Sequence, residues 1–173
     1  MVFQHKNVRL PAAHYVGRRW YFITFCCENR LPVFNDPEHA VWLIEIIRRE
    51  SATNHFAIHA YCVMADHFHF LALGVEETSN LLAFVKLLKQ KSAFEFKKKC
   101  NRALWQKKSY DHILRAKDSV ESVAAYIWMN PVRKGLCVNP GDYSFSGSFT
   151  MDWKECIHSG DPWIPPWKAT TPA

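Results

Sequence analysis

Residues 63–73, with the sequence VMADHFHFLAL, restrict the possible fold more than any other stretch of the chain. Two apolar runs are interrupted at Ala65-Asp66, which predicts two antiparallel strands joined by a tight turn. Side chains two residues apart on a strand point to the same face of a sheet. His67 and His69 should therefore lie side by side, whereas the intervening phenylalanines pack on the opposite face. The stretch predicts a β-hairpin with two neighbouring imidazoles at the start of its second strand.

The histidine pair has two interpretations. Two neutral imidazoles at this spacing can bind one divalent metal ion and leave a coordination position open. A His-x-His pair on a strand is also common in proteins that bind no metal, and this second interpretation is the more frequent one. The spacing of His67 and His69 alone therefore does not establish a metal site.

Hydrophobic periodicity and capping residues predict the elements around this hairpin. The expected elements are a strand at residues 19–27, a helix at 37–52, strands at 56–64 and 67–73, a helix at 80–99, one strand or two short ones within 103–114, and a helix at 118–130. Pro131 should end the last helix, because the residue before a proline disfavours helical angles. This order predicts an α+β fold in which helices cover an antiparallel β-sheet, as in ferredoxin-like and RNA-recognition-motif folds.

The composition fits one globular domain, since 49% of the 173 residues are hydrophobic. The N-terminus has no signal-peptide pattern and no apolar run reaches membrane-spanning length, so we expect a cytoplasmic protein without a membrane partner. The six cysteines show no C-x-x-C spacing and are expected to be reduced and buried. We expect one folded domain at residues 1–150 and a tail rich in proline and tryptophan at residues 151–173.

Basic residues are concentrated in the second half of a chain whose formal net charge is +6. A basic helix face is often only a solvated surface, but clustering of this kind favours a track for nucleic-acid phosphates. Trp105 and Trp128 could stack bases, although most tryptophans of a small domain belong to the core. The residues expected to contact nucleic acid are Lys86, Lys89, Lys97, Lys98, Arg102, Lys107, Lys108, His112, Arg115, Arg133 and Lys134.

The helix predicted at residues 118–130 carries a second candidate group. Its apolar residues form a stripe that should face the core, and Tyr126 and Asn130, four residues apart, share the flank of that stripe. If both point at the histidine pair, Asn130 could be a third metal ligand and Tyr126 could act beside the metal. In the alternative interpretation, Tyr126 covers the edge of the core and Asn130 simply ends the helix. The spacing alone favours this alternative.

The motifs VMADHFHFLAL, YDHILR and YIWMNPVRKGL, in this order, resemble the Y1 transposases, the IS200-like single-strand DNA transposases, and especially the REP-associated tyrosine transposases. The resemblance extends from about Val8 to Ser148. It implies a ferredoxin-like nuclease core of the HUH (His-hydrophobe-His) type. By position it implies metal binding by His67 and His69, completion of the metal shell by Asn130, and a nucleophilic role for Tyr126.

Two positions depart from the family pattern. Phe70 stands where relatives usually have leucine, and Ala65 where they often have proline. Neither change removes a catalytic atom. A rival nucleophile is Tyr110, which neighbours Asp111 and His112, but strand alternation would place Asp111 on the opposite face and spoil a simple proton relay.

The resemblance also implies a function. It implies metal-dependent cleavage and transfer of single-stranded, hairpin-containing DNA through a 5′-phosphotyrosine, with Mg²⁺ or Mn²⁺ as cofactor, near the bacterial nucleoid. Either a monomer or a homodimer could act. One alternative is a domesticated relative that binds hairpin DNA or RNA as a regulator without cleaving it. A hydrolase that activates water is less favoured, because no carboxylate within these motifs could serve as the base.

Overall fold

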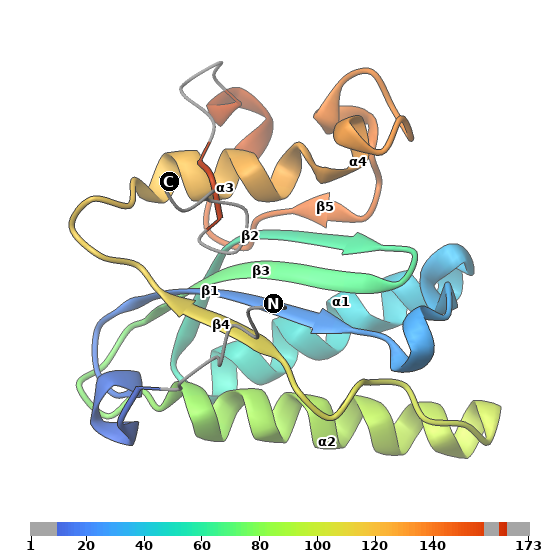
Figure 1. The fold of residues 1–173 in the computed structure, drawn as a ribbon, viewed down its shortest axis with the longest axis horizontal. Helices are drawn as coiled ribbons and strands as arrows, with labels where there is room; N and C mark the ends of the chain where they lie inside the picture. Colours follow the sequence, from blue (N-terminus) through green and yellow to red (C-terminus); the bar gives the residue numbers. More distant parts are fainter. Residues whose placement is uncertain (1–9, 158–162, 166–173) are drawn as a thin grey trace, which may run out of the picture.

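The computed structural model describes residues 10–157 and 163–165, which form a five-stranded sheet with helices on both faces (Figure 1). The sheet has the order β4-β1-β3-β2-β5, and every neighbouring pair is antiparallel. The strands are β1 (Trp20–Cys26), β2 (Phe56–Met64), β3 (His67–Gly74), β4 (Tyr110–Ile113) and β5 (Ser146–Gly147). The predicted α+β class with an antiparallel sheet is confirmed.

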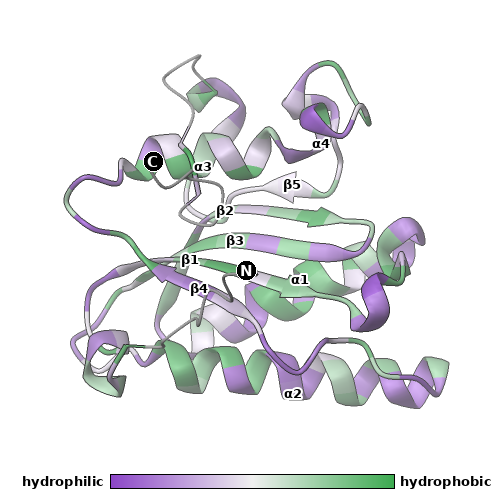
Figure 2. Cartoon of the chain, in the orientation of Figure 1, coloured by the Kyte–Doolittle hydropathy of each residue, from purple (hydrophilic) through white to green (hydrophobic). Residues whose placement is uncertain are grey.

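Four α-helices accompany the sheet in the described residues: α1 (Pro37–Thr53), α2 (Leu81–Cys100), α3 (Val120–Trp128) and α4 (Asn130–Arg133). Helices α1 and α2 cover one face, and α3 lies across the other (Figure 1). Asp36 caps α1, Asn80 caps α2 and Ser119 caps α3, each through a side-chain oxygen that accepts from a backbone N–H of the first turn. Along α2, hydrophilic and hydrophobic residues alternate in patches (Figure 2).

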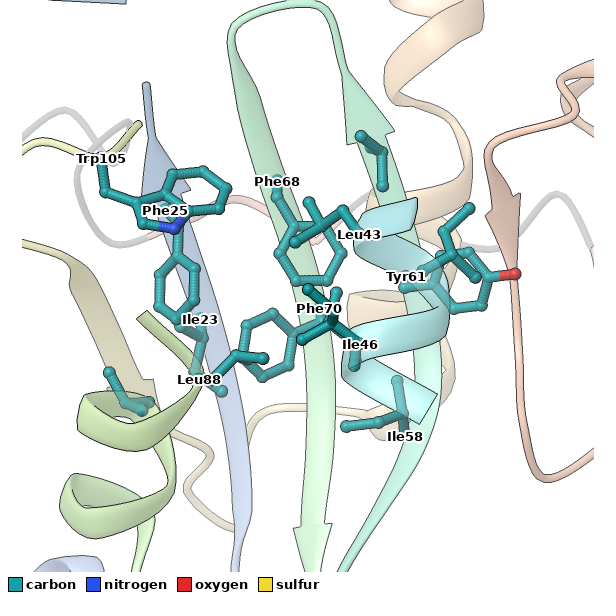
Figure 3. Packing of buried hydrophobic residues seen from close by; sticks show 14 of the residues in the cluster. Ile23, Phe25, Leu43, Ile46, Ile58, Tyr61, Phe68, Phe70, Leu88 and Trp105 are labelled. Carbon is teal, nitrogen blue, oxygen red and sulfur yellow. The ribbon is translucent and has the colours of Figure 1, made fainter. Parts of the chain in front are cut away.

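Aromatic packing beneath the sheet fixes the register of β3. Phe68 and Phe70 are fully buried among residues of β1, α1 and α2 (Figure 3). Their ring centroids lie 4.9 Å apart, and the Phe25 ring lies 5.5 Å from that of Phe70. Burial of each such ring contributes roughly 2–3 kcal/mol. A slip of one residue would remove both phenylalanines from this core and place the histidines in it, so the register is strongly specified.

The end of α3 differs from the expected one. The helix was expected to run to Asn130 and stop before Pro131, but α3 ends at Trp128 and the short helix α4 begins at Asn130. Proline has no backbone N–H and a fixed φ, which suits the first turn of a new helix. The helix is therefore interrupted at Met129 and continues as α4. Arg133, the last residue of α4, donates to the carbonyl oxygen of Tyr126 in α3.

Several smaller expectations are also refined. Trp105 makes only an isolated bridge to Cys27, and β5 was not anticipated because it has two residues.

The six cysteines are all free thiols. Cys27 and Cys62 are buried but Cys156 is exposed, so the expectation of buried cysteines was only partly right. Burial raises the pKa of Cys62 to about 12. Within the described residues no helix combines the length and apolarity needed to cross a membrane.

The junction after β3 yields the first prediction. A Cβ atom on Gly74 would collide with the backbone oxygen of Gly17 and approach Ser79 Cβ to 2.9 Å. Gly74→Ala should therefore lower the free energy of unfolding by about 1–3 kcal/mol in urea titrations. Gly141→Ala is the matched control, because the nearest atom to its added Cβ is a Lys154 side-chain carbon at 3.7 Å. Equal effects of the two substitutions would contradict the close backbone approach at Gly74.

Candidate active site

The two histidines of β3 lie side by side on the sheet face that α3 covers. Their ring centroids are 4.6 Å apart. The Nδ1 atom of His67 lies 2.6 Å from Asp66 Oδ1, and the Nδ1 atom of His69 is hydrogen-bonded to Thr24 Oγ1 at 2.7 Å. These bonds fix the orientation of each ring through its Nδ1 atom. Nε2 is therefore the nitrogen through which either ring would bind an ion.

Burial favours the neutral form of His67, because it lowers the pKa of this imidazole and outweighs the opposing effect of Asp66. Burial opposes ionisation of Asp66, yet the hydrogen bond from His67 and the charge of Arg30 hold the pKa of Asp66 below its usual value. Arg30 donates from Nη1 to Asp66 Oδ2 at 3.1 Å. Asn29 and Arg30 both adopt positive φ, 52° and 56°, so a locally strained turn after β1 brings the arginine to this carboxylate.

Tyr126 reaches the same face from α3. Its ring centroid lies 6.3 Å from that of His69 and 6.1 Å from that of Phe22, and the residue is 9% exposed. Burial raises the pKa of the Tyr126 phenol, and the positive charge of Arg133 opposes this rise. The guanidinium carbon of Arg133 lies 4.2 Å from the centre of the tyrosine ring. The structure thus brings together a phenol, a pair of imidazoles and a cation.

Asn130 lies one helical turn beyond Tyr126 and is buried. Its Nδ2 atom donates to the carbonyl oxygens of Tyr126 and Ile127, at 3.1 Å in each case. These bonds engage the nitrogen end of the amide and leave its oxygen as the atom that could bind a metal. Among the described residues no group of three His, Cys, Asp or Glu side chains is arranged to hold a metal ion. A third protein ligand beside His67 and His69 would therefore have to be of another type.

Tyr110 and His112 share this sheet face, as strand alternation predicted. Tyr110 pairs with Thr24 and His112 with Phe22, whereas Asp111 pairs with Ile23 and belongs to the other face. Burial, followed by the charges of Asp111 and Asp118, raises the pKa of Tyr110 to about 12. His112 bonds to Asp118 through Nε2, at 3.0 Å.

Trp163, which lies near the C-terminus, packs on the same sheet face. Its ring lies 5.1 Å from that of Phe22 and 5.2 Å from that of Tyr126, and its Nε1 atom donates to Asp118 Oδ1 at 3.4 Å. Only 9% of Trp163 is exposed. Residues 163–165 therefore dock on the body of the protein, and the indole covers one side of the Tyr126 ring. The rest of the predicted tail beyond residue 157 lies outside the described residues.

The sequence profile of the IS200-like transposases matches residues 15–130, which include His67, His69, Tyr126 and Asn130. The chain belongs to this family. A protein of Haemophilus influenzae, named as a candidate REP-associated tyrosine transposase, is 26% identical over 113 residues. That alignment covers 59% of this chain and 64% of the relative, a little less than two thirds of its length.

Two solved structures resemble this transposase family member in fold. A REP-associated tyrosine transposase bound to a REP hairpin superposes with a TM-score of 0.72 and 19% identity, over 98% of this chain and 100% of the other. A protein of Deinococcus radiodurans, described as a candidate transposase, gives a TM-score of 0.50 and 22% identity, over 67% of this chain and 88% of the other. At these identities the likeness establishes the shared fold alone.

The residues predicted to contact nucleic acid fall into three groups in this transposase family member. One group lines a groove of about 1970 Å³ between α2 and β4: Lys86, Lys89, Lys107, Lys108, His112 and Arg115. A second group, Lys97, Lys98 and Arg102, lies at the C-terminal end of α2, outside the residues that line this groove. Arg133 and Lys134 form the third group, at the end of α4 beside Tyr126.

Some of these side chains have structural contacts. Lys89 donates to the carbonyl oxygens of Gln106 and Lys107, at 2.7 and 3.2 Å, and so holds the segment before β4. The tryptophans considered as stacking platforms are core residues, since Trp105 is 7% exposed and Trp128 2% exposed. Their aromatic surface is occupied by the protein itself.

The sequence did not identify three residues of the site. Thr24, which orients His69, lies on β1 and could have been found from the pairing of that strand with the hairpin. Asp118 carried only a capping signal, although its carboxylate binds His112 and Trp163. Trp163 had no signal beyond composition, because its docking depends on a contact across 45 residues of sequence.

The carboxylate of Asp118 yields a prediction about acid stability. Burial opposes its ionisation, but the N–H of Arg115, His112 and Trp163 together hold the pKa of Asp118 below its usual value of 3.8. Its stabilising contribution should therefore be complete above about pH 4 and be lost as the pH falls through the lower folded pKa. Asp118→Asn should cost about 2 kcal/mol in free energy of unfolding at pH 7.

Urea titrations between pH 7 and pH 3 measure this contribution. The difference between wild type and Asp118→Asn should shrink at the acidic end of the series. Glu155→Gln, at an exposed carboxylate, should show no such difference at any pH. A gap between wild type and Asp118→Asn that is constant over the whole range would contradict the role of the charge.

Proposed function

We propose that this protein cleaves and rejoins single-stranded DNA beside a hairpin, with Tyr126 as nucleophile and a divalent metal ion held by His67, His69 and Asn130. The observation that carries the proposal is the 6.3 Å separation between the rings of Tyr126 and His69, which come from distant parts of the chain. The REP hairpin bound by the structural relative supports the substrate class. Because Tyr126 lies beside His69 of its own chain, the proposed site does not require a second subunit.

The donor set fits a hard or borderline divalent ion. Two neutral imidazoles and an amide oxygen bring no negative charge, so a site with Mg²⁺ or Mn²⁺ stays cationic and attracts a phosphate. An ion bound there would offset the charge that develops on the non-bridging oxygens of the scissile phosphate. The bonds of the two Nδ1 atoms to Asp66 and Thr24 suit this role, because they hold both rings in place before any ion binds.

Tyr126 would act by direct displacement at phosphorus. Its hydroxyl oxygen forms a bond to the phosphorus atom, the phenolic proton passes to solvent, and the bond from phosphorus to the 3′ oxygen breaks. The leaving oxygen takes up a proton and becomes a free 3′-hydroxyl, while the 5′-phosphate stays on Tyr126. The bond energy is kept in the phosphotyrosine, so attack by another 3′-hydroxyl rejoins the strands without a nucleotide cofactor.

The groove between α2 and β4 is the proposed path for the single-stranded flank of the substrate. His112 and Tyr110 line this groove and also belong to the sheet face of the histidines, so the groove borders the candidate active site. Lys86, Lys107 and Lys108 place positive charge along it. Backbone phosphates are held mainly by such charges, with little dependence on base sequence.

A denaturant-stable adduct tests the nucleophile. Wild type incubated with single-stranded hairpin DNA and Mn²⁺ should form a covalent protein–DNA adduct, visible on denaturing gels. Tyr126→Phe should reduce the amount of adduct by roughly 1000-fold or more, to below detection. The reason is that phenylalanine lacks the attacking oxygen. Chelation of divalent ions should have the same effect on wild type.

Tyr110→Phe is the control for this experiment and should keep the adduct. An adduct that persists in Tyr126→Phe and disappears in Tyr110→Phe would move the nucleophile to β4. Hairpin binding by wild type with no adduct under any divalent ion would favour the non-catalytic regulator.

Charge removal in the groove tests the path of the DNA. The double variant Lys107→Gln/Lys108→Gln should bind the hairpin with its single-stranded flank roughly tenfold more weakly at about 0.1 M salt. The slope of log K against log salt concentration should fall by about 1.4, because each lost single-strand phosphate contact accounts for about 0.7. Fluorescence anisotropy at several salt concentrations measures both quantities.

Lys97→Gln/Lys98→Gln removes the same charge at the far end of α2 and is the matched control. It should change affinity and slope much less. A larger loss in this control would place the phosphate track along α2 instead of in the groove.

A further inference from the structure

Arg133 makes two contacts with Tyr126, which lies seven residues earlier in the chain. Its guanidinium carbon lies 4.2 Å from the centre of the tyrosine ring, and its Nη2 atom donates to the Tyr126 carbonyl oxygen at 2.7 Å. The break between α3 and α4 at Met129 lies between the two residues, and the guanidinium of α4 reaches back to the tyrosine of α3.

The surroundings of Arg133 leave its charge directed at the tyrosine. Within the part of the chain that the structure describes, no ion pair joins the exposed Arg133 to a carboxylate. Its contacts are instead with Tyr126, through the face of the aromatic ring and the backbone carbonyl. A guanidinium has five N–H groups in a rigid fork, and the carbonyl takes one of them.

We propose that Arg133 is the positioning residue of Tyr126: it holds the phenol ring from one face and hydrogen-bonds the phosphate that becomes attached to the tyrosine oxygen. This inference rests on the proposed function. A cation over the ring face restricts the orientation of the phenol, and a planar fork is suited to phosphate oxygens. Arg133 keeps its charge throughout and neither gives nor takes a proton.

Lys134 offers a matched comparison. It follows Arg133 in the chain and is also exposed, but in the described part of the chain it makes no contact with the Tyr126 ring, and its charge acts on His67 instead. Loss of Lys134 should weaken DNA binding without disturbing the position of the Tyr126 ring. Loss of Arg133 should have the opposite pattern, because its contacts are with the nucleophile.

Two measurements on Arg133→Gln, Arg133→Lys and Lys134→Gln separate these effects. They are the dissociation constant for the hairpin and the single-turnover rate of adduct formation at saturating DNA. Arg133→Gln should lower the rate roughly 100-fold and change the dissociation constant less than about threefold. Arg133→Lys should recover part of the rate. In Arg133→Gly, millimolar guanidinium ion should restore adduct formation, which a merely misfolded variant would not show.

A spectroscopic measurement tests the same contact without chemistry. In protein labelled with 3-fluorotyrosine, the ¹⁹F signal of Tyr126 can be assigned by its absence in Tyr126→Phe. Arg133→Gln should shift this signal, whereas Lys134→Gln should leave it unchanged. If wild type forms no adduct, the proposed function fails, and the ¹⁹F signal still decides whether Arg133 positions the ring.

Two outcomes would overturn the inference. One is an unchanged saturating rate in Arg133→Gln with a loss confined to DNA affinity, which would make Arg133 an ordinary phosphate contact. The other is an unchanged ¹⁹F signal of Tyr126 in Arg133→Gln.

Discussion

Strand alternation in β3 is the constraint on which the site depends. Phe68 and Phe70 are buried among aromatic rings beneath the sheet. Because side chains alternate along the strand, His67 and His69 must point to the opposite face. Because the phenylalanines are large and their packing is specific, the histidines are held as firmly as the core itself. The partners of the two imidazoles follow from the same geometry, since Thr24 lies directly opposite His69 on β1. The hydrophobic core thus sets the geometry of a polar site on its far side.

Elements with strong local signals were predictable from the sequence. The hairpin could be read from its alternation, α1 from Pro37 and its apolar spacing, and α2 from its capping residues and length, because each signal lies within a few residues. The shared sheet face of Tyr110 and His112 followed from the same period of two. The roles of Tyr126 and Asn130 came from a family resemblance, since their spacing alone favoured an ordinary helix end. The structure brings Tyr126 beside His69 and places Asn130 one helical turn further on, but it does not test their roles.

Features that depend on tertiary contacts could not be predicted. Trp163, near the C-terminus, packs against Phe22 of β1 and Tyr126 of α3. These contacts join distant parts of the sequence, so no local pattern encodes them. The contact of Arg133 with Tyr126 joins α4 to α3 across a helix break. Pro131 permits this break but does not require it. The lysines of α2 looked equivalent in sequence, yet Lys89 is engaged by backbone carbonyls and Lys97 lies outside the groove. Charge counts cannot distinguish such positions.

The electrostatic balance of the site explains why these features belong together. Burial makes the phenol of Tyr126 a weaker acid and favours the neutral form of His67, so these two groups bring no charge of their own to assist an attack on phosphate. The carboxylate of Asp66 would repel a phosphodiester, but Arg30 is paired with it. Among the described residues, Arg133 is the cation in contact with the Tyr126 ring, and a bound divalent ion would add to its charge. Such a site is complementary to a polyanionic substrate, because the substrate supplies the negative charge.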